Sequence, residues 1–194
     1  MKAYYDRRAP EYDDWWLGHG LFAERDRPGW DKERTQLAGV IAELPAVRTL
    51  DVACGTGFLT KHLPGDVVAL DQSAQMLAQA RVHAPNAGFV QGDALSLPFE
   101  DGAFERAFTS FFYCHLEEED RKRFLREARR VASELVVVAS VRRGEDLPMR
   151  WDDRVLNDGS HWTVYKRLFD GADLADELGG EILFHGRWFL VVGA

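Results

Sequence analysis

A glycine turn in the first half of the chain stands between two acidic residues. The turn runs Asp51-Val52-Ala53-Cys54-Gly55-Thr56-Gly57, and Asp71 follows twenty positions after Asp51. Gly55 and Gly57 permit backbone angles and a close approach that a Cβ would block, so backbone N–H groups of the turn can face a ligand. An acid at the end of the following strand can accept hydrogen bonds from both hydroxyls of a ribose. The spacing therefore predicts a site for a nucleoside-type cofactor.

Two residues near the turn indicate which cofactor this is. A dinucleotide fingerprint has Gly or Ala three positions after its last turn glycine, so that the helix packs close under a pyrophosphate, whereas this chain has Thr60. The carboxylate of Asp51 is poorly placed beside a pyrophosphate but well placed to receive a cationic amino-acid tail. We therefore expect S-adenosylmethionine rather than NAD.

The elements that must position this turn follow from an alternation of short apolar runs and helical patterns after about residue 45. This alternation is typical of βαβ units and a parallel sheet. Strands are expected at 47–52, 66–70, 88–91, 104–109 and 135–141. Helices are expected from the turn to residue 63, after Ser73 as N-cap, and over 117–132. A helix after Asp170 then precedes strands at 181–184 and 188–192, whose tight connection makes them antiparallel.

We expect a single domain over residues 1–194. Residues 1–45 form a helical N-terminal cover, 46–141 the cofactor-binding half, and 142–194 a substrate-side segment with a C-terminal β-hairpin. Residues 142–168 are polar and aromatic without a clear period, so no element is predicted there. The acceptor pocket is expected from segments 1–30 and 142–168.

Composition excludes several classes of partner. The content of 46% hydrophobic and 29% charged residues is that of a globular chain. The net charge of −8 argues against a nucleic-acid partner, and the basic run over residues 121–130 is interpreted as the solvated face of an amphipathic helix. The longest apolar runs are too short to span a bilayer, so no membrane partner is expected. The chain is expected to be a monomer or a homodimer.

The two cysteines, Cys54 and Cys114, are too few for a disulfide framework, and no metal-ligand spacing occurs. We expect both to be reduced thiols in a cytoplasmic protein, and we expect no metal site. The N-terminus has no apolar core for a signal peptide.

Four motifs in order resemble class I S-adenosylmethionine-dependent methyltransferases, in the methyltransferase type 11 (UbiE-like) branch. The run from Leu50 to Gly57 resembles the first motif of that family, and the run from Leu70 to Leu77 resembles the second. The run Gln91-Gly92-Asp93-Ala94, together with the loop at 97–104, resembles the third motif. The opening Tyr5-Asp6 to Tyr12-Asp13 resembles the family's N-terminal segment. One departure is Ala53, where many members have glycine.

The resemblance implies a fold and a set of cofactor contacts. The fold is a Rossmann-like α/β class with a seven-stranded sheet in the order 3-2-1-4-5-7-6, strand seven antiparallel, and helices on both faces. The turn residues Asp51, Ala53, Gly55 and Gly57 belong to the methionine end. The other cofactor-binding positions implied are Tyr12 over the methionine moiety, Asp71 and Gln72 at the ribose, Met76 beside it, Asp93 and Ala94 at the adenine, and Ser110 near the sulfonium.

The resemblance leaves the methyl acceptor open. We expect methyl transfer to oxygen, nitrogen or carbon of a small organic molecule, with S-adenosylhomocysteine as product. The segment Ser110-Phe111-Phe112-Tyr113 lacks the Asn/Asp-Pro-Pro-Tyr/Phe of many nucleobase methyltransferases, which favours a small acceptor. A protein or RNA methyltransferase and a non-catalytic cofactor-binding protein remain alternatives.

Two histidines are candidate general bases, because a hydroxyl or protonated amine acceptor must lose a proton. His115 follows the fourth expected strand, at the edge of a parallel sheet where ligands bind. His161 lies in the segment before the last helix. A structural role is the competing interpretation for each: His115 can cap the following acidic helix, and His161 can lie in a surface loop.

Overall fold

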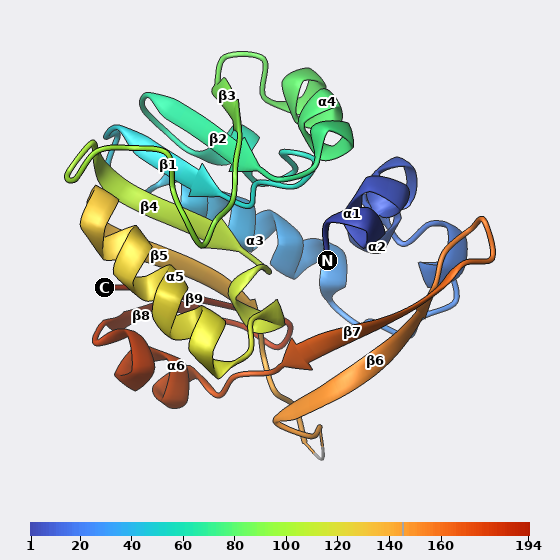
Figure 1. Cartoon of the computed structure of the whole chain (residues 1–194). Helices are drawn as coiled ribbons and strands as arrows, with labels where there is room; N and C mark the ends of the chain where they lie inside the picture. The colour runs from blue at the N-terminus through green and yellow to red at the C-terminus, as the bar shows by residue number, and fades with distance from the viewer. Residues whose placement is uncertain (145) are drawn as a thin grey trace.

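Seven strands form one sheet in the order β3-β2-β1-β4-β5-β9-β8 (Figure 1). The structure is a computed structural model that describes residues 1–144 and 146–194. The strands are β1 Thr49–Val52, β2 Val67–Asp71, β3 Gly88–Gln91, β4 Phe104–Ser110, β5 Ala132–Ser140, β8 Glu181–His185 and β9 Phe189–Gly193. β1 to β5 pair in parallel, and β9 runs antiparallel to both β5 and β8. Counted within this sheet alone, the order is 3-2-1-4-5-7-6 with strand seven antiparallel, which confirms the predicted α/β fold.

Helices cover both faces of the sheet because its central strands are apolar on both sides. In β5, Leu135 and Val137 pack with α5 (Glu118–Val131) and α6 (Gly171–Leu178), while Val136 and Val138 pack on the opposite face with α3 (Trp30–Ala42). α4 (Ala74–His83) covers β2 and β3. These helices lie on the two faces, so the edge at which the parallel strands end is free to form a site.

The first 45 residues are helical, as predicted, and lie outside the sheet. They form α1 Lys2–Arg8, the 3-10 turn η1 Ala9–Glu11, α2 Asp14–Leu17, the 3-10 turn η2 Gly20–Phe22, and α3. Glu33 of α3 joins this cover to the C-terminal hairpin, because its carboxylate accepts backbone N–H bonds from Arg187 at 3.0 Å, Trp188 at 2.6 Å and Phe189 at 2.8 Å.

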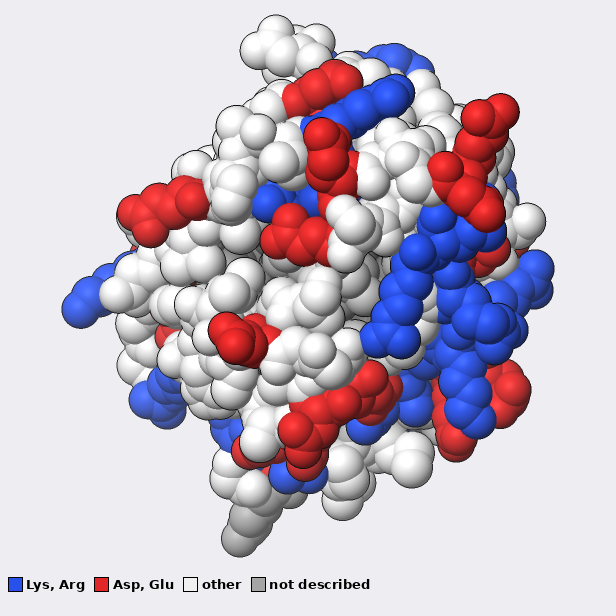
Figure 2. Space-filling model, turned by 90° about the vertical axis from the view of Figure 1, so that its left-hand side faces the viewer, with Lys and Arg blue, Asp and Glu red and all other residues white. Residues whose placement is uncertain are grey.

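The basic run at 121–130 lies on α5, as expected for a helix face. Lys122 pairs with Glu118 and Glu119, and Arg130 pairs with Glu127 and Asp101. On the face shown in Figure 2, basic side chains gather on one side and acidic side chains border them. Arg121 also pairs with Glu177, so three of the six basic side chains of this run are paired with acids.

Two local predictions are wrong. The segment after the glycine turn is not a helix to residue 63 but only the 3-10 turn η3 Thr60–His62. Residues 142–168, for which no element is predicted, contain an antiparallel hairpin of β6 Met149–Val155 and β7 His161–Arg167. This hairpin forms a separate two-stranded sheet, and its strands carry charged side chains where a core strand would carry apolar ones. A further 3-10 turn, η4 Tyr113–His115, follows β4.

Within residues 1–144 and 146–194, no helix is long and apolar enough to cross a membrane. Cys54 and Cys114 are both buried and free.

Candidate active site

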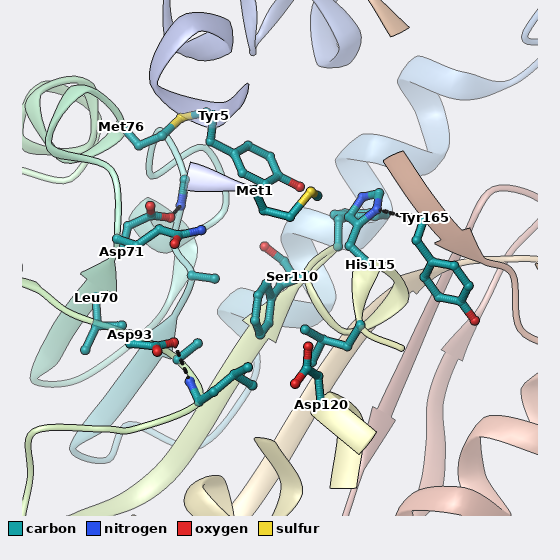
Figure 3. Close-up of a pocket in the computed structure, with 18 of the residues that line it drawn as sticks. Met1, Tyr5, Leu70, Asp71, Met76, Asp93, Ser110, His115, Asp120 and Tyr165 are labelled. Carbon is teal, nitrogen blue, oxygen red and sulfur yellow. Dashed lines mark hydrogen bonds between the residues drawn. The ribbon is translucent and has the colours of Figure 1, made fainter. Parts of the chain in front are cut away.

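A cavity of about 410 Å³ lies at the carboxyl ends of β1, β2 and β4. Its size is in the range of small-molecule sites. Ten predicted site residues line it: Tyr12, Ala53, Gly55, Asp71, Gln72, Met76, Asp93, Ala94, Ser110 and His115. Figure 3 shows Asp71 and Asp93 on one side of the cavity and His115 with Tyr165 on the other, with Tyr5 and Met1 between them.

The glycine turn forms one wall through an unusual backbone. Ala53 has φ +58° and Gly55 has φ +56°, in the left-handed region that glycine enters without strain. Ala53 is thus an alanine in a conformation that favours glycine. The Tyr12 ring lies over Gly55, because a Cβ built there would stand 3.6 Å from its Cε1 atom. Tyr12 therefore closes the cavity over the turn.

Gly57, which is predicted at the methionine end, is not among the residues that line the cavity. Its φ is +77°, and a Cβ there would stand 3.0 Å from the Cα atom of Ala80 in α4. Such a contact is tighter than most Cβ contacts in packed proteins, so the backbone of α4 would have to shift by a few tenths of an ångström. The requirement for glycine at this position comes from close packing of the turn against α4.

Asp71 ends β2 with its carboxylate in the cavity wall and is only 7% exposed. Its Oδ2 atom accepts from the Gly55 N–H at 3.0 Å, and its Oδ1 atom accepts from the Ser73 N–H at 2.8 Å. Burial raises the pKa of this carboxyl, while the two N–H donors hold it in place. Each oxygen retains a second acceptor direction, so Asp71 can accept two hydroxyl donors from the cavity.

Asp51 is buried in β1 and does not itself line the cavity. Its Oδ2 atom accepts from the Thr60 hydroxyl at 2.6 Å, and within the described chain its buried Oδ1 atom has no partner. Burial raises the pKa of Asp51 to about 7. Thr60, which argues against a dinucleotide, thus holds the acid of the turn, and the free Oδ1 atom fits a cationic group.

The loop after β3 supplies the opposite end of the cavity. Asp93 lines it with an exposed side chain whose Oδ1 atom accepts from the Leu95 N–H at 2.9 Å. Ala94 is buried beside it. Met76 of α4 also lines the cavity although it is only 1% exposed. These three residues can enclose a flat ring and accept from its polar edge.

His115 lies at the end of η4, between the cavity and β7. Its Nδ1 atom is 2.7 Å from the Tyr165 carbonyl oxygen. Since a carbonyl only accepts, Nδ1 carries the proton and Nε2 keeps a free lone pair. Burial, together with Lys166, Arg154 and Arg8 nearby, lowers the pKa of His115 to about 3. His115 is therefore a neutral imidazole that can accept a hydrogen bond.

The structure does not bring His161 to the cavity. It is exposed at the start of β7 and is absent from the cavity lining. Its exposed position agrees better with the alternative of a surface residue than with that of a general base. Among the described residues, no group of three or more His, Cys, Asp or Glu side chains could hold a metal ion.

Several lining residues are not among the predicted site residues. They include Met1, Tyr5, Phe111, Phe112, Trp151 and Tyr165. Phe111 has φ +54°, which is rare for a bulky residue and is found where surrounding structure enforces it. Tyr5 comes from α1 and Trp151 from the β6–β7 hairpin, so part of this wall lies in the two segments expected to form the acceptor pocket.

Comparison with known proteins identifies relatives of this arrangement. Residues 50–136 match the family model of a methyltransferase domain, which confirms the family that the motifs resemble. A demethylmenaquinone methyltransferase of Renibacterium salmoninarum is 33% identical over 134 residues, which are 68% of this chain and 53% of that protein. Its namesake in Thermotoga maritima is 34% identical over 132 residues, covering 66% and 54%. The chain spans about half the length of these curated relatives.

Solved structures share the whole fold. A DhpI–SAH complex has a TM-score of 0.74 at 24% identity and covers 98% of this chain and 92% of that chain. A possible histamine N-methyltransferase from Thermotoga maritima has a TM-score of 0.66 at 20% identity, covering 100% and 98%.

Proposed function

We propose that this chain, whose residues 50–136 belong to the methyltransferase domain family, is an S-adenosylmethionine-dependent methyltransferase that acts on a small organic molecule. The observation that carries the proposal is Asp71. Its buried carboxylate is fixed by the glycine turn and opens into a cavity of about 410 Å³. Methylation at oxygen, nitrogen or carbon is compatible with this site.

The residues of the cavity fit this cofactor from end to end. Asp71 accepts from the two ribose hydroxyls, with Gln72 and Met76 beside it. Asp93 accepts from the adenine amino group, and the Ala94 backbone adds a contact. Tyr12 covers the methionine moiety over Gly55. The unpartnered Oδ1 atom of Asp51 favours a cationic amino-acid tail above the turn.

When bound, S-adenosylmethionine supplies an electrophilic methyl group, whose bond to sulfur breaks with the electron pair left on sulfur as the acceptor atom bonds to carbon. The protein's part is to align the acceptor with that carbon and to exclude water. Tyr5, Tyr12 and Phe111 form the walls that do so. At Nε2, His115 accepts a hydrogen bond from a hydroxyl or amine acceptor and so orients it, because Nδ1 already donates to the Tyr165 carbonyl oxygen. With a pKa of about 3 the imidazole is a weak base, so the proton of the acceptor passes on to solvent.

A quinone-type ring is a second candidate for the acceptor. Aromatic side chains line the half of the cavity away from Asp71 and offer faces for stacking. The curated relatives are named for demethylmenaquinone, which adds to this candidate. An acceptor panel must therefore include a naphthoquinol beside small hydroxylated and aminated acids.

Calorimetric titration with S-adenosylhomocysteine tests the cofactor site. We expect binding of one molecule per chain, and a loss of affinity of tenfold or more in Asp71→Ala, since hydrogen bonds to a charged group contribute about 1.5–3 kcal/mol each. Asp176→Asn on exposed α6 is the matched control and should bind like the wild type. Formation of S-adenosylhomocysteine across the panel then tests catalysis. Cofactor binding without turnover of any acceptor would favour a non-catalytic protein, and preference for NAD would refute the proposal.

A further inference from the structure

A small pocket lined by three cations lies directly behind the cavity wall. It has a volume of about 50 Å³, and its basic residues are Arg8 of α1, Arg154 of β6 and Lys166 of β7. The remaining described residues that line it are neutral: Tyr4, Tyr5, Tyr12, Trp15, Phe111, Cys114, His115, Ser140 and Val164. Within the described chain, no carboxylate faces this cationic pocket.

The β6–β7 hairpin aims its charges at the body of the protein. Arg150 pairs with Lys166 in the strand register, and Arg154 lies four residues further along β6. Side chains at every second position of a strand share a face. Val164 is on that face too and packs in a buried cluster with Tyr4. The cations of the hairpin therefore face inward, toward α1, rather than outward to solvent.

The positive charge of the pocket is only partly neutralised. Asp152 serves two guanidinium groups, since its Oδ1 atom is 2.6 Å from Arg150 Nε and its Oδ2 atom is 2.7 Å from Arg154 Nη2. Among the described residues, Lys166 has no carboxylate within 4.0 Å. Burial lowers the pKa of Lys166, and the nearby Arg154 and Arg150 lower it further, whereas Cys114 and Asp152 raise it.

Arg8 is a further cation of the pocket, and no described carboxylate pairs with it. Its guanidinium lies 5.2 Å from the centre of the Tyr12 ring and donates to the Tyr4 hydroxyl. Its Nε atom is buried, and no hydrogen-bond partner for it exists in the described part of the chain. Removing a cation from water without a counter-charge costs free energy. A bound anion would therefore stabilise this arrangement.

The cationic pocket lies between two larger spaces and shares lining residues with each. It shares Tyr5, Tyr12, Phe111 and His115 with the cofactor cavity. It shares Trp15, Ser140, Arg154 and Lys166 with an outer groove of about 500 Å³. The groove carries further arginines but also the carboxylates of Asp26, Asp146, Asp152 and Asp153. The uncompensated charge is thus concentrated in the pocket between groove and cavity, which is unlike the continuous basic track that RNA requires.

We propose that the cationic pocket binds an anionic group of the methyl acceptor, a carboxylate or a phosphoryl-type oxyanion. Lys166, Arg154 and Arg8 hold the anion, and the acceptor enters from the outer groove. Its nucleophilic atom then lies on the side of His115 and Tyr5, within the cofactor cavity. This inference rests on the proposed function, and it assigns to that site an acidic class of acceptor.

The test uses inorganic phosphate and acetate as probes, with acetamide as the neutral match for acetate. Each is titrated into the full chain saturated with S-adenosylhomocysteine, and binding is followed by calorimetry. We expect phosphate or acetate to bind one per chain, and acetamide not to bind. Stronger phosphate binding identifies a phosphoryl-type acceptor, and stronger acetate binding a carboxylate. Lys166→Met and Arg154→Met should each weaken anion binding tenfold or more, and Lys166→Arg should retain most of it.

Controls separate this inference from the proposed function. Lys32→Met, on an exposed turn of α3, should bind both anion and cofactor like the wild type. Lys166→Met should keep its affinity for S-adenosylhomocysteine, which shows that it is folded. Equal anion binding by Lys166→Met, Arg154→Met and wild type overturns the inference while the cofactor result stands. Tight binding of an RNA oligomer that depends on the same two residues also overturns it. A chain that binds no S-adenosylhomocysteine refutes the proposed function instead.

Discussion

Replacing Asp51 with asparagine is expected to stabilise the protein while impairing its site. Burial raises the pKa of Asp51 to about 7 from an ordinary value of 3.8. A folded pKa above the unfolded one means that the protonated carboxyl favours folding. That contribution is complete below about pH 4 and is lost as the pH rises through 7. Since one pKa unit corresponds to about 1.4 kcal/mol, the ionised carboxylate costs on the order of 4 kcal/mol at pH 8.

Asparagine has nearly the same shape and can still accept from Thr60 through its carbonyl oxygen, but it carries no charge. Urea unfolding without cofactor should therefore show Asp51→Asn more stable than the wild type at pH 8, by up to about 4 kcal/mol. The difference should shrink to less than about 2 kcal/mol at pH 5, because the folded wild type is then protonated. Asp176→Asn, which is exposed, should show no such dependence on pH.

The same substitution should weaken S-adenosylhomocysteine binding about tenfold, because the amino-acid tail loses its counter-charge. A stability difference that is equal at pH 5 and pH 8, or a less stable variant at pH 8, would refute the account of Asp51 as a carboxylate penalised by burial.

Three further substitutions test separate parts of the structure. Glu33→Ala removes the acceptor of three backbone N–H groups and should lower the unfolding free energy by about 2–4 kcal/mol. Glu24→Ala, at an exposed position, is the control. A loss no larger than that of the control would contradict the anchoring role of Glu33. Gly57→Ala places a Cβ 3.0 Å from Ala80 and should cost about 2–4 kcal/mol and weaken cofactor binding. Gly102→Ala has a similar φ of +66° but open space, so it should cost only about 1–2 kcal/mol, and equal losses would dismiss the packing argument. His115→Asn should lower kcat/KM for a hydroxyl acceptor about tenfold, as expected for the loss of one orienting hydrogen bond, with cofactor affinity retained. With a pKa of about 3, the imidazole should give the wild type no ionisation of its own between pH 6 and 9. An unchanged kcat/KM would show that His115 does not orient the acceptor, and a loss of about 100-fold or more would show that it is the base.

The sequence was most informative where the local backbone conformation requires a particular residue type. Gly55 and the acid at the end of β2 locate the cofactor end because the turn and the strand fix them within a short stretch of chain. The central strands could also be predicted, since β5 is apolar on both faces. The role of Gly57 at the methionine end stays a prediction, because a glycine required for packing against Ala80 looks identical in sequence to one required by a ligand.

The two segments of the proposed acceptor end were predicted, but its individual residues were not, because they are distant in sequence. Arg8, Arg154 and Lys166 are separated by up to 158 positions, and only the placement of α1 against the β6–β7 hairpin brings them together. The hairpin itself has charged residues on its inward face, so it shows no apolar alternation. His161 was a reasonable candidate from its segment, but the strand turns it to solvent.

A crystal structure of the chain with S-adenosylhomocysteine tests the central claim most directly. The account predicts that both ribose hydroxyls lie within hydrogen-bond distance of Asp71, that the adenine lies beside Asp93, and that the sulfur faces the wall shared by Tyr5 and His115, next to the cationic pocket. A ligand whose ribose does not contact Asp71, or whose sulfur faces away from His115 and the cationic pocket, would contradict it.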